Sequence, residues 1–297
     1  MSSLPLHNTG RAPRPSLLTW RRWWSRLDTV GALFLLVFFC LIFVAPFAWL
    51  VITALKSTAD LDTFPITWLP SHPQWDNFLR AVTEINYPRY AMNSIVLSTL
   101  YSTLVTLSSA LVGFGFARLQ GRGKRQLFLL MLATLMLPAI VGLIPTYVIF
   151  SRLGMIDTYW PWIVGGLGSS PFLSFLFRQF FTSIPPELEE AAIVDGCGYG
   201  RIFWQIFLPL SKPVLATSFI LSFAGVWGDF LGPSLYLSAD NTTLAVAIAN
   251  GYASAHGETA ANVLAAGCVI YMVPVLITFF LAQRYLISGT VTTGLKG

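Results

Sequence analysis

Charge is what this sequence lacks most. Of its 297 residues only 10% are Asp, Glu, Lys or Arg, whereas 55% are hydrophobic and 14% are aromatic. A typical soluble domain carries about 25% charged residues. A water-soluble chain of this composition would have too few charges to cover its surface. The alternative is a large, very apolar soluble enzyme, and the spacing of the remaining charges decides between the two.

Cysteine and histidine are also scarce, which bears on catalysis. The three cysteines are Cys40, Cys197 and Cys268. The three histidines are His7, His72 and His256. No cysteine spacing is typical of a metal, redox or disulfide site, and the histidines lie outside the apolar segments. We therefore expect structural cysteines, no cofactor or metal on this chain, and no intramembrane enzyme.

Long uncharged runs are abundant. No charge occurs between Asp28 and Lys56, Arg89 and Arg118, Arg125 and Arg152, Asp157 and Arg178, or Glu258 and Arg284. A sixth run, 213–236, is interrupted only by Asp229. A membrane-spanning helix needs about 20 mostly apolar residues. The sequence therefore predicts an all-α, multi-pass membrane protein with spans near 29–55, 91–117, 127–150, 160–182, 208–236 and 262–286.

The basic residues orient these spans. One group precedes the first span and another separates the second from the third: Arg11, Arg14, Arg21, Arg22, Arg26, Arg118, Arg122, Lys124 and Arg125. The last outer loop, 237–261, has no Lys or Arg. By the positive-inside rule both termini lie in the cytoplasm. This asymmetry accounts for most of the net charge of +5, so no nucleic-acid partner is needed to explain it.

The predicted organisation follows from these spans. A cytoplasmic tail (1–28) precedes the first helix (29–55), an extracytoplasmic loop (56–90) and a five-helix core (91–286), with a second tail at 287–297. The first apolar segment is too long for a removable signal peptide. Pro138, Pro145 and Pro171 interrupt the third and fourth spans, and neighbouring helices must satisfy the freed backbone groups.

One loop inside the core, about 184–207, is polar in an otherwise apolar region. Pro186 and the carboxylates after it suit the first turn of a helix, and Gly196 suits its left-handed end. Leu188, Ala191, Ala192 and Gly196 recur at helical spacing and form one small apolar face. An exposed apolar face normally has a partner. The alternative is a helix packed against its own bundle.

The same loop carries a recognisable pattern. Glu190-Ala191-Ala192 and Asp195-Gly196, followed by Ile206-Phe207-Leu208-Pro209, resemble the EAA motif of binding-protein-dependent ABC importer permeases. The resemblance covers about 90–297 and is closest to carbohydrate-importer permeases similar to the smaller maltose-permease subunit. It also includes Asn93-Ser94 and Ser170-Pro171-Phe172.

The resemblance implies a type I ABC importer permease of the plasma (inner) membrane of a prokaryote. Such a chain forms half of a sugar or oligosaccharide pathway beside a second, homologous permease subunit, within membrane lipid. Two ATPase subunits, which bind ATP and Mg, drive transport, and an extracytoplasmic sugar-binding protein delivers the substrate. The residues implied to couple to the ATPase are Glu190, Ala191, Ala192, Asp195, Gly196, Leu208 and Pro209. The chain has no G-x-x-x-x-G-K-[ST] phosphate loop, so it is expected not to be an enzyme.

Two further segments are candidate sites. Trp227 and Asp229 are candidates for the substrate pathway, because a carboxylate in a span is costly unless it faces water or a partner. The alternative is a carboxylate that pairs with a neighbouring helix or is solvated. Many similar permeases have Asn where this chain has Gly228, which is a departure from the pattern. The resemblance also implies that the tail Gly294, Leu295, Lys296 and Gly297 contacts the ATPase pair, the alternative being a frayed end.

The main alternative function is an ion-coupled secondary transporter. Such proteins usually place acids or unwound helices near the membrane midplane. Here Asp229 is the one obvious acid in a predicted span, and no clear internal repeat is present. The sequence therefore favours an ATP-driven importer, without naming its sugar.

Overall fold

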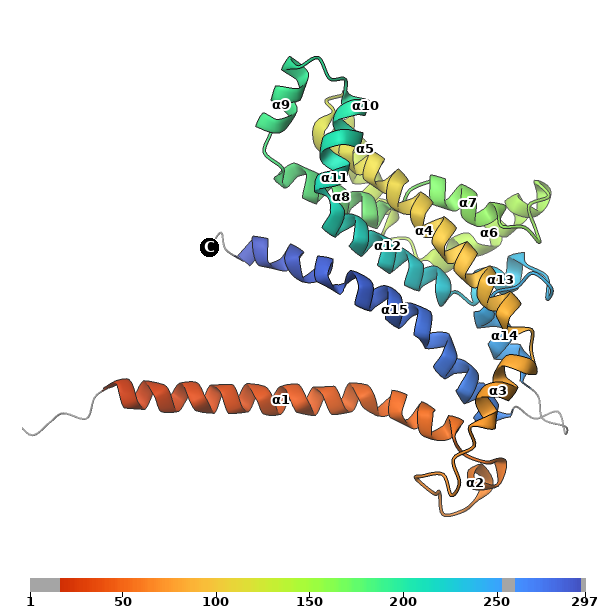
Figure 1. Ribbon diagram of the computed structural model, residues 1–297. Coiled ribbons are helices and arrows are strands. Elements are labelled where there is room, and N and C mark those ends of the chain that lie inside the picture. Colours follow the sequence, from red (N-terminus) through yellow and green to blue (C-terminus); the bar gives the residue numbers. More distant parts are fainter. Residues whose placement is uncertain (1–16, 253–259, 295–297) are drawn as a thin grey trace, which may run out of the picture. The chain divides into compact units, whose positions relative to one another are not determined.

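The computed structural model describes residues 17–252 and 260–294, and every regular element within them is a helix (Figure 1). This confirms the all-α prediction. The chain divides into two units, one up to Val51 and one from Ile52. The first contains most of α1 (Leu17–Ala54). The second contains α2 (Thr58–Asp62), α3 (Asp76–Thr83), α4 (Tyr87–Arg118), α5 (Lys124–Thr134), α6 (Ala139–Arg152), α7 (Trp160–Leu167), α8 (Pro171–Ser183), α9 (Glu187–Val194), α10 (Tyr199–Ile202), the π-helical turn η1 (Phe203–Phe207), α11 (Leu208–Leu210), α12 (Lys212–Trp227), α13 (Leu231–Tyr236), α14 (Leu244–Gly251) and α15 (Ala261–Gly294).

Three helical segments in the described part of the chain are long and apolar enough to cross a membrane: Thr29–Ala54, Tyr87–Arg118 and Ala261–Leu281. A bent pair, Tyr199–Leu210 with Lys212–Trp227, whose two parts meet at 80°, makes a fourth if the two parts form one span. The third and fourth predicted spans are each divided into two shorter helices, so the count of six stays a prediction. The helical backbone also runs beyond the predicted ends, because α1 begins at Leu17 and α15 continues to Gly294.

The breaks in the divided spans fall at two of the three prolines expected to interrupt them, whereas Pro145 lies inside the continuous helix α6, so the interruption expected there is wrong. Pro138 precedes α6 with an extended backbone, and Pro171 is the first residue of α8. The backbone N–H of Ser170 donates to the hydroxyl of Ser109 on α4, at 2.9 Å. The hydroxyl of Ser108 donates to the carbonyl of Gly166, at 2.7 Å. Polar groups at the break are thus satisfied by side chains of a neighbouring helix, as a low-dielectric environment requires.

Helix α4 packs against α7, α8 and α12, and glycine makes two of these contacts close. A Cβ atom on Gly113 would lie 2.5 Å from the Cβ of Phe177 on α8. A Cβ atom on Gly166 would lie 2.8 Å from the Cβ of Leu104 on α4. The second contact shows that small residues let the backbones of α4 and α7 approach closely.

A loop at 237–243 connects α13 to α14 and is fastened to α4. The side-chain amide of Asn93 donates to the carbonyls of Thr242, at 3.0 Å, and Asn241, at 3.3 Å. The backbone N–H of Leu244 donates to the hydroxyl of Ser94, at 2.8 Å. Asn93 and Ser94, which the sequence marked only by resemblance, therefore hold this loop in place.

The turn between α6 and α7 fastens the same loop from another direction. Asp157 has a left-handed backbone, with φ of 60°. Its Oδ1 accepts hydrogen bonds from the N–H of Ser238, at 2.9 Å, and the hydroxyl of Ser238, at 2.7 Å. The amide of Asn241 donates to the same oxygen at 3.1 Å. These bonds to the charged form hold the pKa of the Asp157 carboxyl below its usual value.

The contact of α4 with α8 predicts a sharp difference between two neighbouring glycines. Gly113→Ala should lower the stability of the purified protein by about 1–3 kcal/mol, because the new methyl group meets the backbone of Ser174 and Arg178 as well as Phe177. The control is Gly115→Ala, whose Cβ would meet only the tip of Leu119, at 4.0 Å. Thermal unfolding in detergent measures both. Equal melting temperatures for the two variants would contradict the packing described here.

The lowered pKa of Asp157 predicts how its contribution to the stability of the fold changes with pH. A carboxyl whose pKa is lowered by folding stabilises the fold above its unfolded pKa and loses that effect as pH falls through the folded pKa. The difference in melting temperature between wild type and Asp157→Asn should therefore be constant from about pH 5 to 8, and should shrink only below the ordinary carboxyl value of 3.8. Melting curves over this range check it; a difference that vanishes near pH 6 would contradict it.

Candidate functional site

The polar loop forms the predicted helix. Helix α9 carries Glu187, Glu189 and Glu190 in its first turn, where negative charge is favoured by the helix dipole. The helix ends at Val194, and Gly196, two residues later, has φ of 80° and donates its N–H to the carbonyl of Ile193 at 2.9 Å. The left-handed stop expected at Gly196 is confirmed.

The exposed apolar face of α9 differs from the predicted one, because Ala192 is buried and Val194 is exposed. Ala192 is only 7% exposed and packs into the helical bundle. Leu188, Ala191 and Val194 are exposed, Val194 by 87%. The prediction that Ala192 shares the exposed face is wrong, because one side of α9 must rest on the bundle and the small Ala192 side chain allows that contact. We call Leu188, Ala191 and Val194 the outer face of α9.

An aromatic cluster lies beneath Ala192. It consists of Phe114 from α4, Phe177 and Phe181 from α8, and Phe203 and Phe207 from η1. Phe114 is central, with ring centroids 5.0 Å from Phe207 and 5.3 Å from Phe203. Each ring is almost fully buried. The cluster therefore joins three elements and α9 in one apolar core.

The Leu208-Pro209 pair explains the π-helical turn before it. Proline has no N–H with which to continue an α-helical hydrogen-bond ladder. Here the N–H of Leu208 bonds to the carbonyl of Phe203, five residues earlier. Leu208 packs against the aromatic cluster, whereas Pro209 is exposed. Such turns occur frequently at functional sites, and this one precedes the 80° bend into α12.

Arg118, at the end of α4, fastens α9 to the bundle. Its side chain is 11% exposed and forms an ion pair with Glu189, with 3.5 Å between nitrogen and oxygen. The guanidinium donates to the carbonyl of Phe181, at 2.7 Å, and to that of Ile184. It also lies 4.9 Å from the ring centroid of Phe207. Sequence reasoning counted Arg118 only as a topology-setting charge, because its partners lie more than 60 residues away and leave no local pattern.

Another basic pair lies close by, at the start of α5. The ammonium group of Lys124 donates to the carbonyl of Leu119, at 2.6 Å. Partial burial, and then the neighbouring charge of Arg178, lower the pKa of Lys124. Arg178 itself lies 4.1 Å from the ring centroid of Phe128. The Lys124 bond thus closes the turn between α4 and α5, and Arg178 joins α8 to α5.

The two pathway candidates lie at the turn after α12. Trp227 is 1% exposed, stacks on Tyr271 of α15 and donates its indole N–H to the Tyr271 carbonyl at 3.2 Å. Asp229 is half-buried and accepts a hydrogen bond from the N–H of Gly232, in the first turn of α13, at 3.1 Å. These contacts fix the turn between α12 and α13. Of the tail candidates, Gly294 is the last residue of α15, and Leu295, Lys296 and Gly297 lie outside the described residues.

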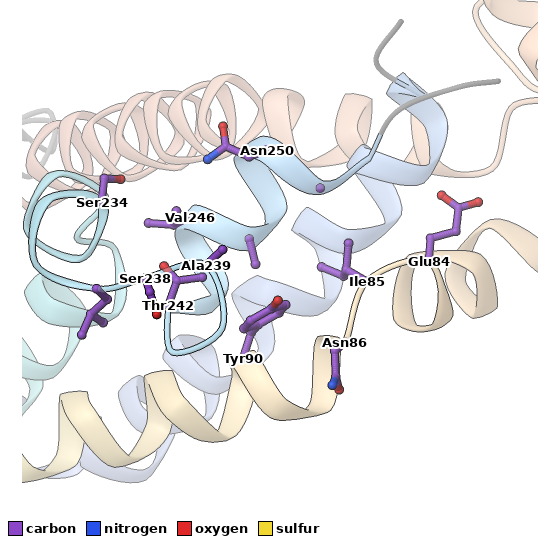
Figure 2. Close-up of a pocket in the computed structure, with 13 residues that line it drawn as sticks. Glu84, Ile85, Asn86, Tyr90, Ser234, Ser238, Ala239, Thr242, Val246 and Asn250 are labelled. Atoms are coloured by element: carbon purple, nitrogen blue, oxygen red, sulfur yellow. The ribbon is translucent and has the colours of Figure 1, made fainter. Parts of the chain in front are cut away.

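A cavity of about 570 Å³ lies at the opposite end of α4, and sequence reasoning did not identify it. It is lined from the end of α3, the start of α4, and α13 and α14 with the loop between them. Figure 2 shows Ser238 and Thr242 next to each other and Tyr90 on the facing helix α4, with Glu84 at one end and Ser234 at the other. Its residues are spread over 168 positions of sequence, so no local motif marks it.

Comparisons with known proteins agree on one family. The family described as "binding-protein-dependent transport system inner membrane component" matches residues 109–291. The chain is 35% identical over 280 residues to the probable ABC transporter permease protein YurM of Bacillus subtilis, covering 93% of this chain and 91% of the relative. It is 34% identical over 277 residues to the arabinooligosaccharides transport system permease protein AraQ of Halalkalibacterium halodurans, covering 92% and 97%.

A third relative is the diacetylchitobiose uptake system permease protein NgcG of Streptomyces coelicolor, 31% identical over 262 residues, covering 88% of this chain and 86% of the relative. The fold is similar to that in a crystal structure of a bacterial ABC transporter involved in the import of the acidic polysaccharide alginate. The TM-score is 0.73 at 22% identity, covering 93% of this chain and all of the other. The chain belongs to the family of inner membrane components of binding-protein-dependent transport systems, and is a permease subunit rather than an enzyme.

Proposed function

We propose that this chain is the permease subunit of an ATP-driven importer of sugars or oligosaccharides, and that it forms half of the translocation pathway. The observation that carries this proposal is the exposed outer face of α9. Its outer face is exposed, while Ala192 and Glu189 fasten the helix to the bundle. An exposed apolar face on a fixed helix is suited to a protein partner. Relatives named for diacetylchitobiose and arabinooligosaccharides support a carbohydrate substrate.

The family supports the partners that we propose for this chain. A binding protein delivers the substrate, a second, homologous permease subunit completes the pathway, and two ATPase subunits bind ATP and Mg. The basic residues before the first span and between α4 and α5 favour a topology with both termini in the cytoplasm. That topology places α9 on the side of the ATPase. The tail 294–297 is proposed to contact the ATPase pair as well.

The contacts around α9 give a physical route for coupling. Displacement of α9 by the ATPase would pull on Arg118 through Glu189, and so on the end of α4. It would also press Ala192 against the aromatic cluster, which α4 and α8 share. Cores packed in this way transmit displacement because they are not readily compressed. Trp227 and Asp229 are proposed to contribute to the pathway indirectly, because their contacts hold the turn between α12 and α13 in place.

The alternative is an ion-coupled secondary transporter. It would need a carboxylate able to bind the coupling ion within a span. Asp229, the candidate for that role, already accepts the Gly232 N–H. The exposed outer face of α9 has no function in such a transporter, which favours the ATP-driven proposal.

The proposed function makes a direct prediction for reconstituted transport. In proteoliposomes containing the full complex and its binding protein, uptake of labelled diacetylchitobiose or an arabinooligosaccharide should require ATP and continue when an uncoupler collapses ion gradients. Ala191→Trp should abolish uptake and ATPase association, because bulk on the outer face of α9 prevents seating. The control is Thr182→Trp, an exposed position at the end of α8. Uptake driven by an ion gradient without ATP would overturn the proposal. Unchanged ATPase association in Ala191→Trp would exclude both the role of α9 as the ATPase contact and its placement in the cytoplasm.

The contacts of Arg118 predict that one substitution will separate ATPase association from the coupling of ATP hydrolysis to transport. Arg118→Lys keeps the charge but loses the planar fork that reaches Phe181, Ile184 and Glu189 together. Loss of a charge-assisted hydrogen bond weakens the anchoring of α9 by about 1.5–3 kcal/mol. The ATPase should still associate, because the outer face is unchanged, while the amount of saccharide imported per ATP hydrolysed falls. Arg122→Lys, at an exposed position of the following turn, is the matched control. Equal transport per ATP in both variants would exclude a positioning role for Arg118.

A further inference from the structure

The cavity at the start of α4 carries an inference that rests on the proposed function and extends it. Its lining is rich in side chains that exchange hydrogen bonds with hydroxyl groups. They are Glu84, Asn86, Tyr90, Ser234, Ser238, Thr242 and Asn250. Ligand sites of small molecules usually measure about 300–1,000 Å³, and this cavity of about 570 Å³ lies in that range.

Thr242 is the residue that points to a ligand. It is only 5% exposed, and its hydroxyl has no hydrogen-bond partner among the described residues. Buried polar groups are nearly always paired, because leaving one unpaired is unfavourable. Thr242 lines the cavity, where Figure 2 shows it beside Ser238, and Tyr90 lines the same cavity from α4. The Thr242 hydroxyl oxygen itself has almost no exposed surface, so a rotation of the side chain about its Cα–Cβ bond would bring it to a ligand oxygen in the cavity, which would supply the missing partner.

Tyr90 gives the site its second feature. Its half-buried ring enters the cavity from α4. Sugar rings present an apolar face of C–H groups and an edge of hydroxyls, so an aromatic ring beside hydrogen-bonding side chains matches both. Asn250, on α14, offers a donor and an acceptor in one amide group. Glu84, the one charged side chain in the lining, is paired with Arg80 at 2.7 Å, and no Lys or Arg is among the described residues that line the cavity, so nothing there favours an anionic ligand.

The wall that carries Thr242 is held in place before any ligand binds. Asn93 bonds to the Thr242 carbonyl, and Ser94 accepts the N–H of Leu244. Asp157 holds Ser238 from the other side, at 2.7 and 2.9 Å. A preformed wall lowers the entropic cost of binding.

We propose that this cavity is a saccharide-binding site on the permease itself, which takes a small neutral sugar or one end of an oligosaccharide. The Thr242 hydroxyl bonds to a sugar oxygen, and Tyr90 packs against the apolar face of a sugar ring. In the proposed topology the cavity lies on the extracytoplasmic side, so it would receive the sugar on its way from the binding protein into the pathway.

The test measures protection of a cysteine in the cavity. Ala239→Cys, at an exposed lining position, is made in the complete complex with Cys40, Cys197 and Cys268 replaced by serine or alanine. Its modification by an impermeant thiol reagent is followed in the absence of binding protein. Diacetylchitobiose, a maltodextrin and an arabinooligosaccharide serve as probes at millimolar concentrations. At least one should slow the reaction. Asp240→Cys, an exposed neighbour that does not line the cavity, should react at an unchanged rate.

Two substitutions then test the proposed contacts. Thr242→Val removes the hydroxyl at nearly constant volume. It should raise the saccharide concentration that is needed for half-maximal protection of the cysteine roughly 2- to 10-fold. Thr83→Val, an exposed position of α3 outside the cavity, should leave it unchanged. Tyr90→Ala should weaken protection, and Tyr90→Phe, which retains the ring, should restore most of it.

The remaining outcomes separate this inference from the proposed function. If the complex imports these saccharides with ATP while none protects Ala239→Cys, the cavity is not a saccharide site and the importer function stands. If binding protein alone gives the protection and saccharide does not, the cavity is a protein-docking surface and the inference is overturned. If the complex imports no saccharide under any condition, the proposed function fails and the inference fails with it.

Discussion

Two glycines, Gly113 and Gly166, leave no room for a side chain where α4 crosses α8 and α7. In a bilayer, helices gain little from burying apolar surface against one another, so close van der Waals packing and interhelical hydrogen bonds hold them together. The hydroxyls of Ser108 and Ser109 make such bonds at the same crossing. The divided span α7–α8 therefore depends on α4 for both its packing and its backbone hydrogen bonds.

Helix α4 also connects the two candidate sites. At one end Arg118 holds α9 and the end of α8. At the other end Asn93 and Ser94 hold the loop that walls the cavity. A single helix of 32 residues thus reaches from the proposed ATPase contact to the proposed saccharide site. Because α4 contacts both, a movement imposed on α9 can be transmitted through this helix to the wall of the cavity.

Much of this could be predicted from the sequence, because the signals were local. Uncharged runs gave the helical class, the Pro186–Gly196 segment gave α9 with its left-handed end, and Pro138 and Pro171 marked real breaks in helices. The family was recognised from a composite motif, and the comparisons confirm it. Helix ends were less accurate: α1 and α15 extend further because helical backbone need not stop where the apolar run does.

What the sequence could not provide were contacts between distant segments. Spacing could group Ala192 with Ala191 on α9, but not decide which of the two rests on the bundle. The cavity draws on α3, α4, α13 and α14, and Thr242 is unremarkable until its hydroxyl is found buried without a partner among the described residues. Asp229 was singled out as an acid in a span, and its bond to the Gly232 N–H becomes visible only once the turn is built.

The way in which Arg118 makes its contacts has a consequence for how this protein can change over time. Two of its polar partners, at Phe181 and Ile184, are main-chain carbonyls, and every amino acid carries one. Substitutions at those two positions that keep the backbone in place leave both hydrogen bonds available. The contacts that depend on the type of side chain are those of Arg118 with the acid Glu189 and with the aromatic ring of Phe207. The junction between loop and bundle can thus persist while much of the sequence around it drifts.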